Sequence, residues 1–165
     1  MSTRSQIIVE GNEEVKLYRH SDGYPYGEYG VLASLVPDVS GFRQLRGHDP
    51  YYLPARIMGG QIRRAEKSGR AALKAEKGAG RNTDFARQMY FALGYGIDTV
   101  FHSDVEYVYY VRENGNIEVY ETHRGWWDTT EDNVWARLGS YASLIGTVTP
   151  RTPKSVYQEI GRQQD

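Results

Sequence analysis

Cysteine is absent from the sequence. Its absence excludes disulfide bonds, zinc–thiolate sites, iron–sulfur clusters and cysteine nucleophiles. Chains without cysteine suit a reducing compartment, so we expect a cytoplasmic protein. The chemistry of this chain therefore rests on side chains other than thiols.

Long apolar runs and the common catalytic motifs are also missing. No apolar run approaches the length of a membrane span, and no secretory signal opens the chain, so we expect no membrane contact. The sequence lacks a P-loop, a dinucleotide fingerprint, a nucleophile elbow and a paired-histidine zinc motif. We therefore expect no cofactor, and no standard motif identifies an enzyme or assigns a metal ligand.

The composition is that of one folded domain. The 165 residues are 39% hydrophobic and 25% charged, which is ordinary for a globular protein large enough to bury a core. We expect a single domain over residues 1–150 and a C-terminal tail over residues 151–165. The 14 tyrosines favour strands, and they also favour binding surfaces.

Apolar residues at period two, together with turn signals, predict the strands. The expected strands cover residues 5–10, 15–20, 97–101, 106–112 and 116–122. The last two are joined at Asn114-Gly115, a strong hairpin signal.

Apolar residues at helical spacing predict the helices. The expected helices cover residues 28–36, 57–77, about 82–94 and about 129–146, and residues 37–55 are expected to be irregular. Pro37 should end the first helix. The order of elements predicts an α+β fold, in which two hairpins and a short strand form a single antiparallel sheet with helices packed on one face.

The densest group of reactive side chains lies between Tyr18 and Pro25. If the second strand continues, His20 and Asp22 project from the same face beside a turn at Gly23. Such a pair could serve as an acid–base pair or as half of a metal site. In the structural alternative, the aspartate caps the turn and the histidine only hydrogen-bonds to it.

Arg4 is expected to join this group if the first two strands pair across their turn. Arg4, His20, Asp22 and Tyr24 then form a candidate ligand-binding site for a phosphate or a carboxylate. The alternative is an arginine–aspartate pair with a purely structural role.

A second His-x-Asp triplet, His102 and Asp104, follows the short predicted strand. If it meets His20 and Asp22 in the sheet, the four side chains could bind a divalent ion and support a small metal-assisted hydrolase. The alternative is two surface turns, each capped by its aspartate.

Charge is segregated along the chain, although the net charge is -1. Eight basic residues oppose two acidic ones between Arg56 and Arg81, a net charge of +6. Nine acidic residues oppose two basic ones between Asp98 and Asp132, a net charge of −7. Such segregation can steer partners or drive self-association, so a homo-oligomer stays open.

One helical face carries most of the basic excess. Arg63, Lys67, Arg70 and Lys74, continued by Lys77, repeat at four and three residues and form a candidate phosphate-binding stripe on helix 57–77. Nearby Tyr51 and Tyr52 could stack on bases. The alternatives are a solvated face, or a face paired with the acidic hairpin of a second copy.

The N-terminal segment carries a resemblance. Thr3-Arg4-Ser5 with Ile7, followed by His20-x-Asp22-Gly23-Tyr24-Pro25, resembles a group of small uncharacterised bacteriophage and bacterial proteins. Those proteins open with Thr-Arg-Ser and continue to a Tyr-x-His-Trp-Asp-Gly-Tyr-type box, so Ser21 stands where they usually carry Trp. The resemblance covers about the first quarter of the chain. It implies a phage-like setting, hence a host cytoplasm, and a shared local structure, but no chemistry.

Three functions follow as expectations. The leading one is a non-enzymatic, phage-type accessory protein that binds a protein or a phosphate-bearing ligand through the loop surface from His20 to Tyr24. The metal-assisted hydrolase is the alternative. Nucleic-acid binding by helix 57–77 is the third.

Overall fold

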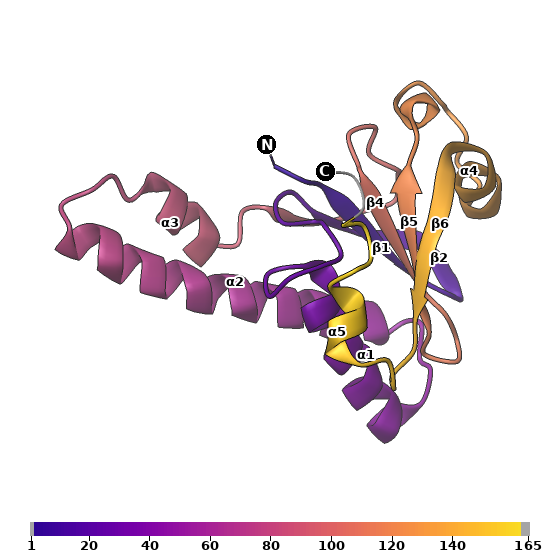
Figure 1. The fold of residues 1–165 in the computed structure, drawn as a ribbon, viewed down its shortest axis with the longest axis horizontal. Coiled ribbons are helices and arrows are strands. Elements are labelled where there is room, and N and C mark those ends of the chain that lie inside the picture. Colours follow the sequence, from indigo (N-terminus) through magenta and orange to yellow (C-terminus); the bar gives the residue numbers. More distant parts are fainter. Residues whose placement is uncertain (1, 163–165) are drawn as a thin grey trace.

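The computed structural model describes residues 2–162, which form an α+β domain around one six-stranded sheet (Figure 1). The strand order is β3-β2-β1-β4-β5-β6. The strands are β1 (Ser5–Val9), β2 (Asn12–Arg19), β3 (Tyr95–Asp98), β4 (Tyr107–Val111), β5 (Ile117–Thr122) and β6 (Ala142–Val148). The helices are α1 (Val31–Arg46), α2 (Leu53–Gly78), α3 (Asp84–Tyr90), α4 (Val134–Tyr141) and α5 (Lys154–Tyr157), with a 3₁₀ turn η1 (Arg124–Trp127).

The sheet is mixed, so the prediction of a purely antiparallel sheet is wrong. β1 and β4 run parallel, while the other neighbouring strands are antiparallel. Every residue of β1 and of β4 is buried, which is the pattern of central strands covered on both faces. Pairing these two strands places the most apolar segments of both hairpins in the middle of the sheet.

Helices cover both faces of the sheet, not one face as predicted. Leu17 and Tyr109 point into a cluster shared with α1, the start of α2 and α5. Ile8 and Val108 point into a second cluster, which contains Trp126 from η1 and residues of α4. Successive strand residues face opposite ways, so the apolar pairs Ile7-Ile8 and Val108-Tyr109 require cover on both sides.

The first helix does not end at Pro37, because α1 continues to Arg46. Pro37 is exposed, and its missing N–H removes only one bond within the helix. Asp38 and Val39 just beyond it are buried, so tertiary packing outweighs that cost. The segment predicted to be irregular, residues 37–55, shrinks to residues 47–52.

The last predicted helix, residues 129–146, is also too long. α4 ends at Tyr141, and the chain continues at once as β6, which pairs with β5 from Thr122 to Ile117. Without β6, the backbone of β5 would present an unpaired edge. The following segment, predicted as a tail, contributes α5, and Tyr157 is buried in the first cluster. Residues 163–165 lie outside the described residues.

Candidate functional site

A projecting arm is the most distinctive feature of the molecule. The first turns of α2 pack on the body through Leu53 and Ile57, and the helix then extends away from it (Figure 1). α3 folds back along the far half of α2. Gly69 permits this close approach, because a Cβ there would lie 2.2 Å from the backbone nitrogen of Tyr90. We call residues 63–93 the arm.

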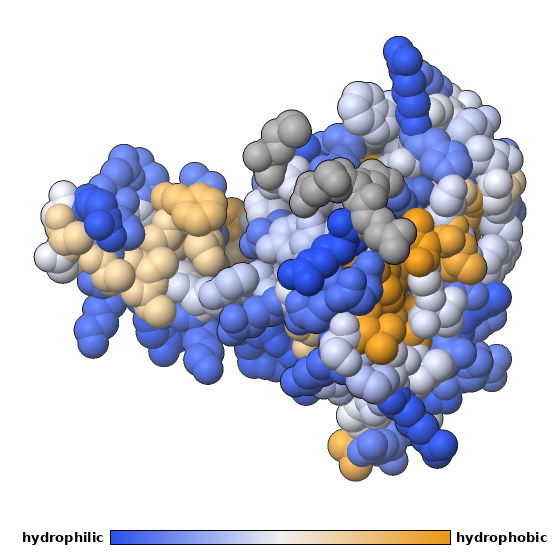
Figure 2. Space-filling model, viewed as in Figure 1, coloured by the Kyte–Doolittle hydropathy of each residue, from blue (hydrophilic) through white to orange (hydrophobic). Residues whose placement is uncertain are grey.

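One face of the arm carries a line of cations, which we call the basic stripe. It consists of Arg63, Lys67, Arg70, Lys74 and Lys77, and all five are exposed. At 1.5 Å per residue the stripe is roughly 21 Å long. Figure 2 shows hydrophilic side chains along the lower edge of the arm and more hydrophobic ones where α3 lies.

The cations of the basic stripe have no carboxylate partner among residues 2–162. The other basic residues of this segment behave differently. Arg64 and Arg56 approach the buried Asp38 at 2.8 and 3.7 Å, and Arg81 pairs with Glu76 at 2.6 Å. The free positive charge of the segment is thus concentrated on one face of α2.

Several acidic groups of the body are already engaged within the molecule. Glu118 accepts from Arg112 and from the hydroxyl of Tyr120, both at 2.9 Å. Glu10 receives a second bond from Arg112 at 3.3 Å. Arg112 therefore offsets part of the predicted acidic excess at Glu118.

The predicted ligand site is divided among separate interactions. The Arg4 Nε atom lies 3.0 Å from a carboxylate oxygen of Asp104, a residue that the sequence analysis had placed in the other triplet. His20 is exposed, and its Nδ1 lies 3.2 Å from the hydroxyl of Tyr18. Arg4 is therefore engaged by a carboxylate other than the expected Asp22.

Asp22 and Tyr24 lie together beyond the end of β2. Asp22 is exposed, with a positive φ of 54°. Burial raises the pKa of the Tyr24 hydroxyl, and the neighbouring Asp22 carboxylate raises it further. The backbone N–H of Gly23 donates to the carbonyl of Thr3 at 2.9 Å, so the two halves of the resemblance motif are in contact. His20 does not bond to Asp22 as the structural alternative expected, because its Nδ1 faces the hydroxyl of Tyr18.

Tyr18 links the two histidines of the predicted triplets. Its ring stacks on His102 with centroids 4.3 Å apart, and the ring of His20 lies 6.3 Å away. His102 pairs through Nε2 with Asp98 at 2.8 Å, and this hydrogen bond holds the pKa of the Asp98 carboxyl below its usual value. Sequence reasoning missed Asp98, the carboxylate that His102 contacts.

The hydrolase interpretation requires both triplets to share one coordination sphere. Their histidines do come to the same end of the sheet, but Asp22 and Asp104 contact other groups. Among residues 2–162, no group of three or more histidine or acidic side chains could hold a metal ion. The arrangement on which that mechanism depends is therefore absent from the described part of the chain.

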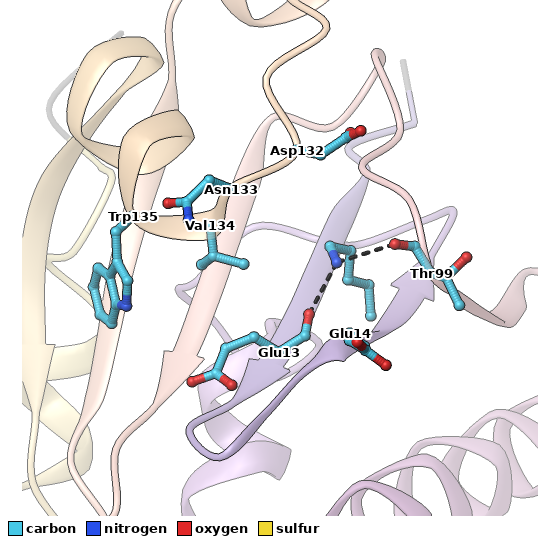
Figure 3. A pocket seen from close by; sticks show the side chains of 8 residues that line it. Glu13, Glu14, Thr99, Asp132, Asn133, Val134 and Trp135 are labelled. Carbon is cyan, nitrogen blue, oxygen red and sulfur yellow. Dashed lines mark hydrogen bonds between the residues drawn. The ribbon is translucent and has the colours of Figure 1, made fainter.

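An open groove of ≈ 490 Å³ lies between β2 and the start of α4 (Figure 3). Glu13, Glu14 and Asp132 make its lining acidic. Its one cation among the lining residues, Lys16, donates to the carbonyls of Glu13 and Thr99 at 2.9 and 3.1 Å. Burial lowers the pKa of the Lys16 ammonium. With its cation already satisfied, this groove is poorly suited to a phosphate.

Comparison with protein-family models, with curated proteins and with solved structures finds no match to this chain. No helix in the described part of the chain is long and apolar enough to cross a membrane.

Proposed function

We propose that the protein binds a nucleic acid along the basic stripe of its arm. The observation that carries this proposal is the set of five exposed cations at single-face spacing, none of which has a carboxylate partner in the described residues. Cations left free in this way can neutralise phosphates and release the counterions condensed on them. The arm projects from the body, so a long polymer can reach the stripe (Figure 1).

The charge of the body determines which part of the protein contacts the polymer. The chain has a net charge of -1, so the rest of the molecule is acidic once the basic stripe is set aside. Like charges repel the body from a phosphate backbone, while the stripe is attracted to it. Binding should therefore begin at the arm.

The test is the salt dependence of binding to a fluorescently labelled oligonucleotide. If the five cations each neutralise one phosphate, the slope of log K against log salt should be about −3.5 to −4.5. The variant Lys67→Gln/Lys74→Gln should bind about 10- to 100-fold more weakly and show a shallower slope, because two contacts are lost.

The matched control is Arg151→Gln/Lys154→Gln, which removes two exposed charges away from the arm. It should bind like the unmodified protein. Equal losses in both variants would show that only net charge matters and would overturn the assignment to the arm. The protein could instead form a homo-oligomer that dissociates at high salt and show no affinity for the oligonucleotide. That result would mean that the stripe contacts a second copy of the chain and not a nucleic acid.

A protein partner at the surface from His20 to Tyr24 is a second candidate, in keeping with the phage-type role inferred from the resemblance. It is favoured by two exposed side chains, His20 and Asp22, beside the 64% exposed Tyr29. Alanine at His20 and Asp22 should abolish capture of such a partner from host extract while the melting temperature stays the same. Variants that unfold would show that this surface is structural.

A further inference from the structure

Two exposed aromatic rings stand at the N-terminal end of α2, before the turns that pack on the body. Tyr51 and Tyr52, just before and at the start of α2, are 75% and 57% exposed. Tyrosines this exposed bury little apolar surface in the fold, and each presents a ring face that can stack on a planar group. Their position relative to the basic stripe decides what they could bind.

Tyr52 lies on the same helical face as the stripe. Its backbone is already helical, with φ −101° and ψ −29°. Arg63 and Arg70 follow 11 and 18 residues later, which is close to three and five complete turns. Tyr52 therefore shares the face of the stripe but precedes its first cation by 11 residues, and the distance from Tyr52 to Lys77 along α2 is roughly 38 Å. An aromatic ring stands at one end of a row of cations.

Contacts within the protein hold the backbone of Tyr51 and Tyr52, and the ring of Tyr52, in place. The Asp49 carboxylate accepts from the backbone N–H groups of Tyr51 and Tyr52 at 3.2 and 3.3 Å. The same carboxylate accepts from Arg46 Nε at 2.8 Å, and the Arg46 guanidinium lies 3.9 Å from the centre of the Tyr52 ring. The Tyr52 ring, ordered in this way by Arg46, loses less conformational entropy on binding.

We infer that the nucleic acid is single-stranded and that Tyr51 and Tyr52 stack on its bases while the basic stripe follows its backbone. This inference rests on the proposed function. A duplex pairs and stacks its bases internally, so it offers the stripe only phosphates. A single strand offers both phosphates and free base faces, which matches a cationic track with aromatic rings beside it.

The test compares a single-stranded oligonucleotide with the duplex of the same sequence at one salt concentration. The unmodified protein should bind the single strand about 5- to 100-fold more tightly than the duplex, which is the gain in affinity expected from stacking one base on an aromatic ring. The variant Tyr51→Ala/Tyr52→Ala should lose this preference while its affinity for the duplex stays unchanged. Tyr52→Phe, which keeps the ring, should retain the preference.

Trp127→Ala is the control, since it removes another exposed aromatic ring, from η1 on the sheet face opposite α2, and should change neither affinity. Circular dichroism of the double variant verifies that α2 is intact. Equal affinity for both forms, or an equal loss of both in the double variant, would overturn the inference and leave the stripe's role standing. Absence of salt-sensitive binding to either form would overturn the proposed function as well.

Discussion

Arg19 shows how one buried side chain holds the loop after β2. It is 8% exposed, and its guanidinium donates to the carbonyls of Ser21 and Tyr29 at 2.8 and 2.9 Å. A third bond reaches the side-chain oxygen of Gln61 on α2 at 2.9 Å. The Arg19 guanidinium thus connects the segment around His20 to α2, two residues before the arm begins.

We expect Arg19→Lys to lower the free energy of unfolding by about 1–3 kcal/mol. A lysine ammonium cannot reach all three acceptors, and a buried carbonyl left without a donor is costly. Urea denaturation measures the effect, with the exposed Arg151→Lys as the neutral comparison. An unchanged unfolding midpoint for Arg19→Lys would show that water satisfies these carbonyls.

At the scale of the elements, the arm is packed separately from the body. Neither hydrophobic cluster of the body contains a residue of α3. α3 is held mainly by its contact with α2, where Gly69 lets the two backbones meet. Phe85, Phe91 and Leu93 remain largely exposed on the arm. The arm should therefore open without unfolding the sheet.

Gly69→Ala is expected to detach α3 selectively. The new methyl group would lie 2.2 Å from a backbone atom of Tyr90, so one helix must move. Hydrogen exchange should accelerate in α3 while the strands keep their protection. Gly78→Ala is the matched control, because a Cβ there meets nothing within 4 Å. Faster exchange throughout the sheet would contradict a separate arm.

The elements also show what the sequence could and could not predict. Local signals found both hairpins, because alternation and Asn114-Gly115 are properties of neighbouring residues. They failed at Pro37 and at Ala142, where contacts with distant segments override local preference. The parallel pairing of β1 with β4 depends on residues about 100 positions apart, which no short pattern encodes.

The candidate site was predictable for the same reason that the hairpins were. The spacing of Arg63, Lys67, Arg70 and Lys74 is a local helical pattern, so the stripe could be read from the chain. That these cations lack carboxylate partners within residues 2–162, while Arg64 has Asp38, depends on the packing of α1 against α2. The contact of Arg4 with Asp104 was not predicted, because that aspartate belongs to a distant loop.

At the scale of the whole molecule, tyrosines should limit stability at high pH. Burial raises the pKa of Tyr107 and of Tyr120 to about 12, with Glu121 and Glu118 as further causes respectively. Unfolded tyrosines ionise near 10.0. Above that pH the unfolded chain binds fewer protons than the folded one, so stability falls as the pH rises.

We expect the free energy of unfolding to fall above pH 10 by about 1.4 kcal/mol per pH unit for each such tyrosine. Urea denaturation across this range measures the slope of the unfolding free energy against pH. Tyr107→Phe should reduce this slope by the contribution of one tyrosine. Ultraviolet absorbance of the phenolate reports ionisation independently. An unfolding free energy that does not change between pH 10 and pH 12 would contradict the raised pKa of these hydroxyls.

The most direct test of the basic stripe is the reactivity of its lysines in the presence of a single-stranded oligonucleotide. Acetylation followed by mass spectrometry reports each lysine separately. We expect Lys67, Lys74 and Lys77 to be protected by the oligonucleotide at low salt and released at high salt, while the exposed Lys154 on α5 reacts unchanged. Equal protection of Lys154, or none at the three arm lysines, would contradict binding through the arm.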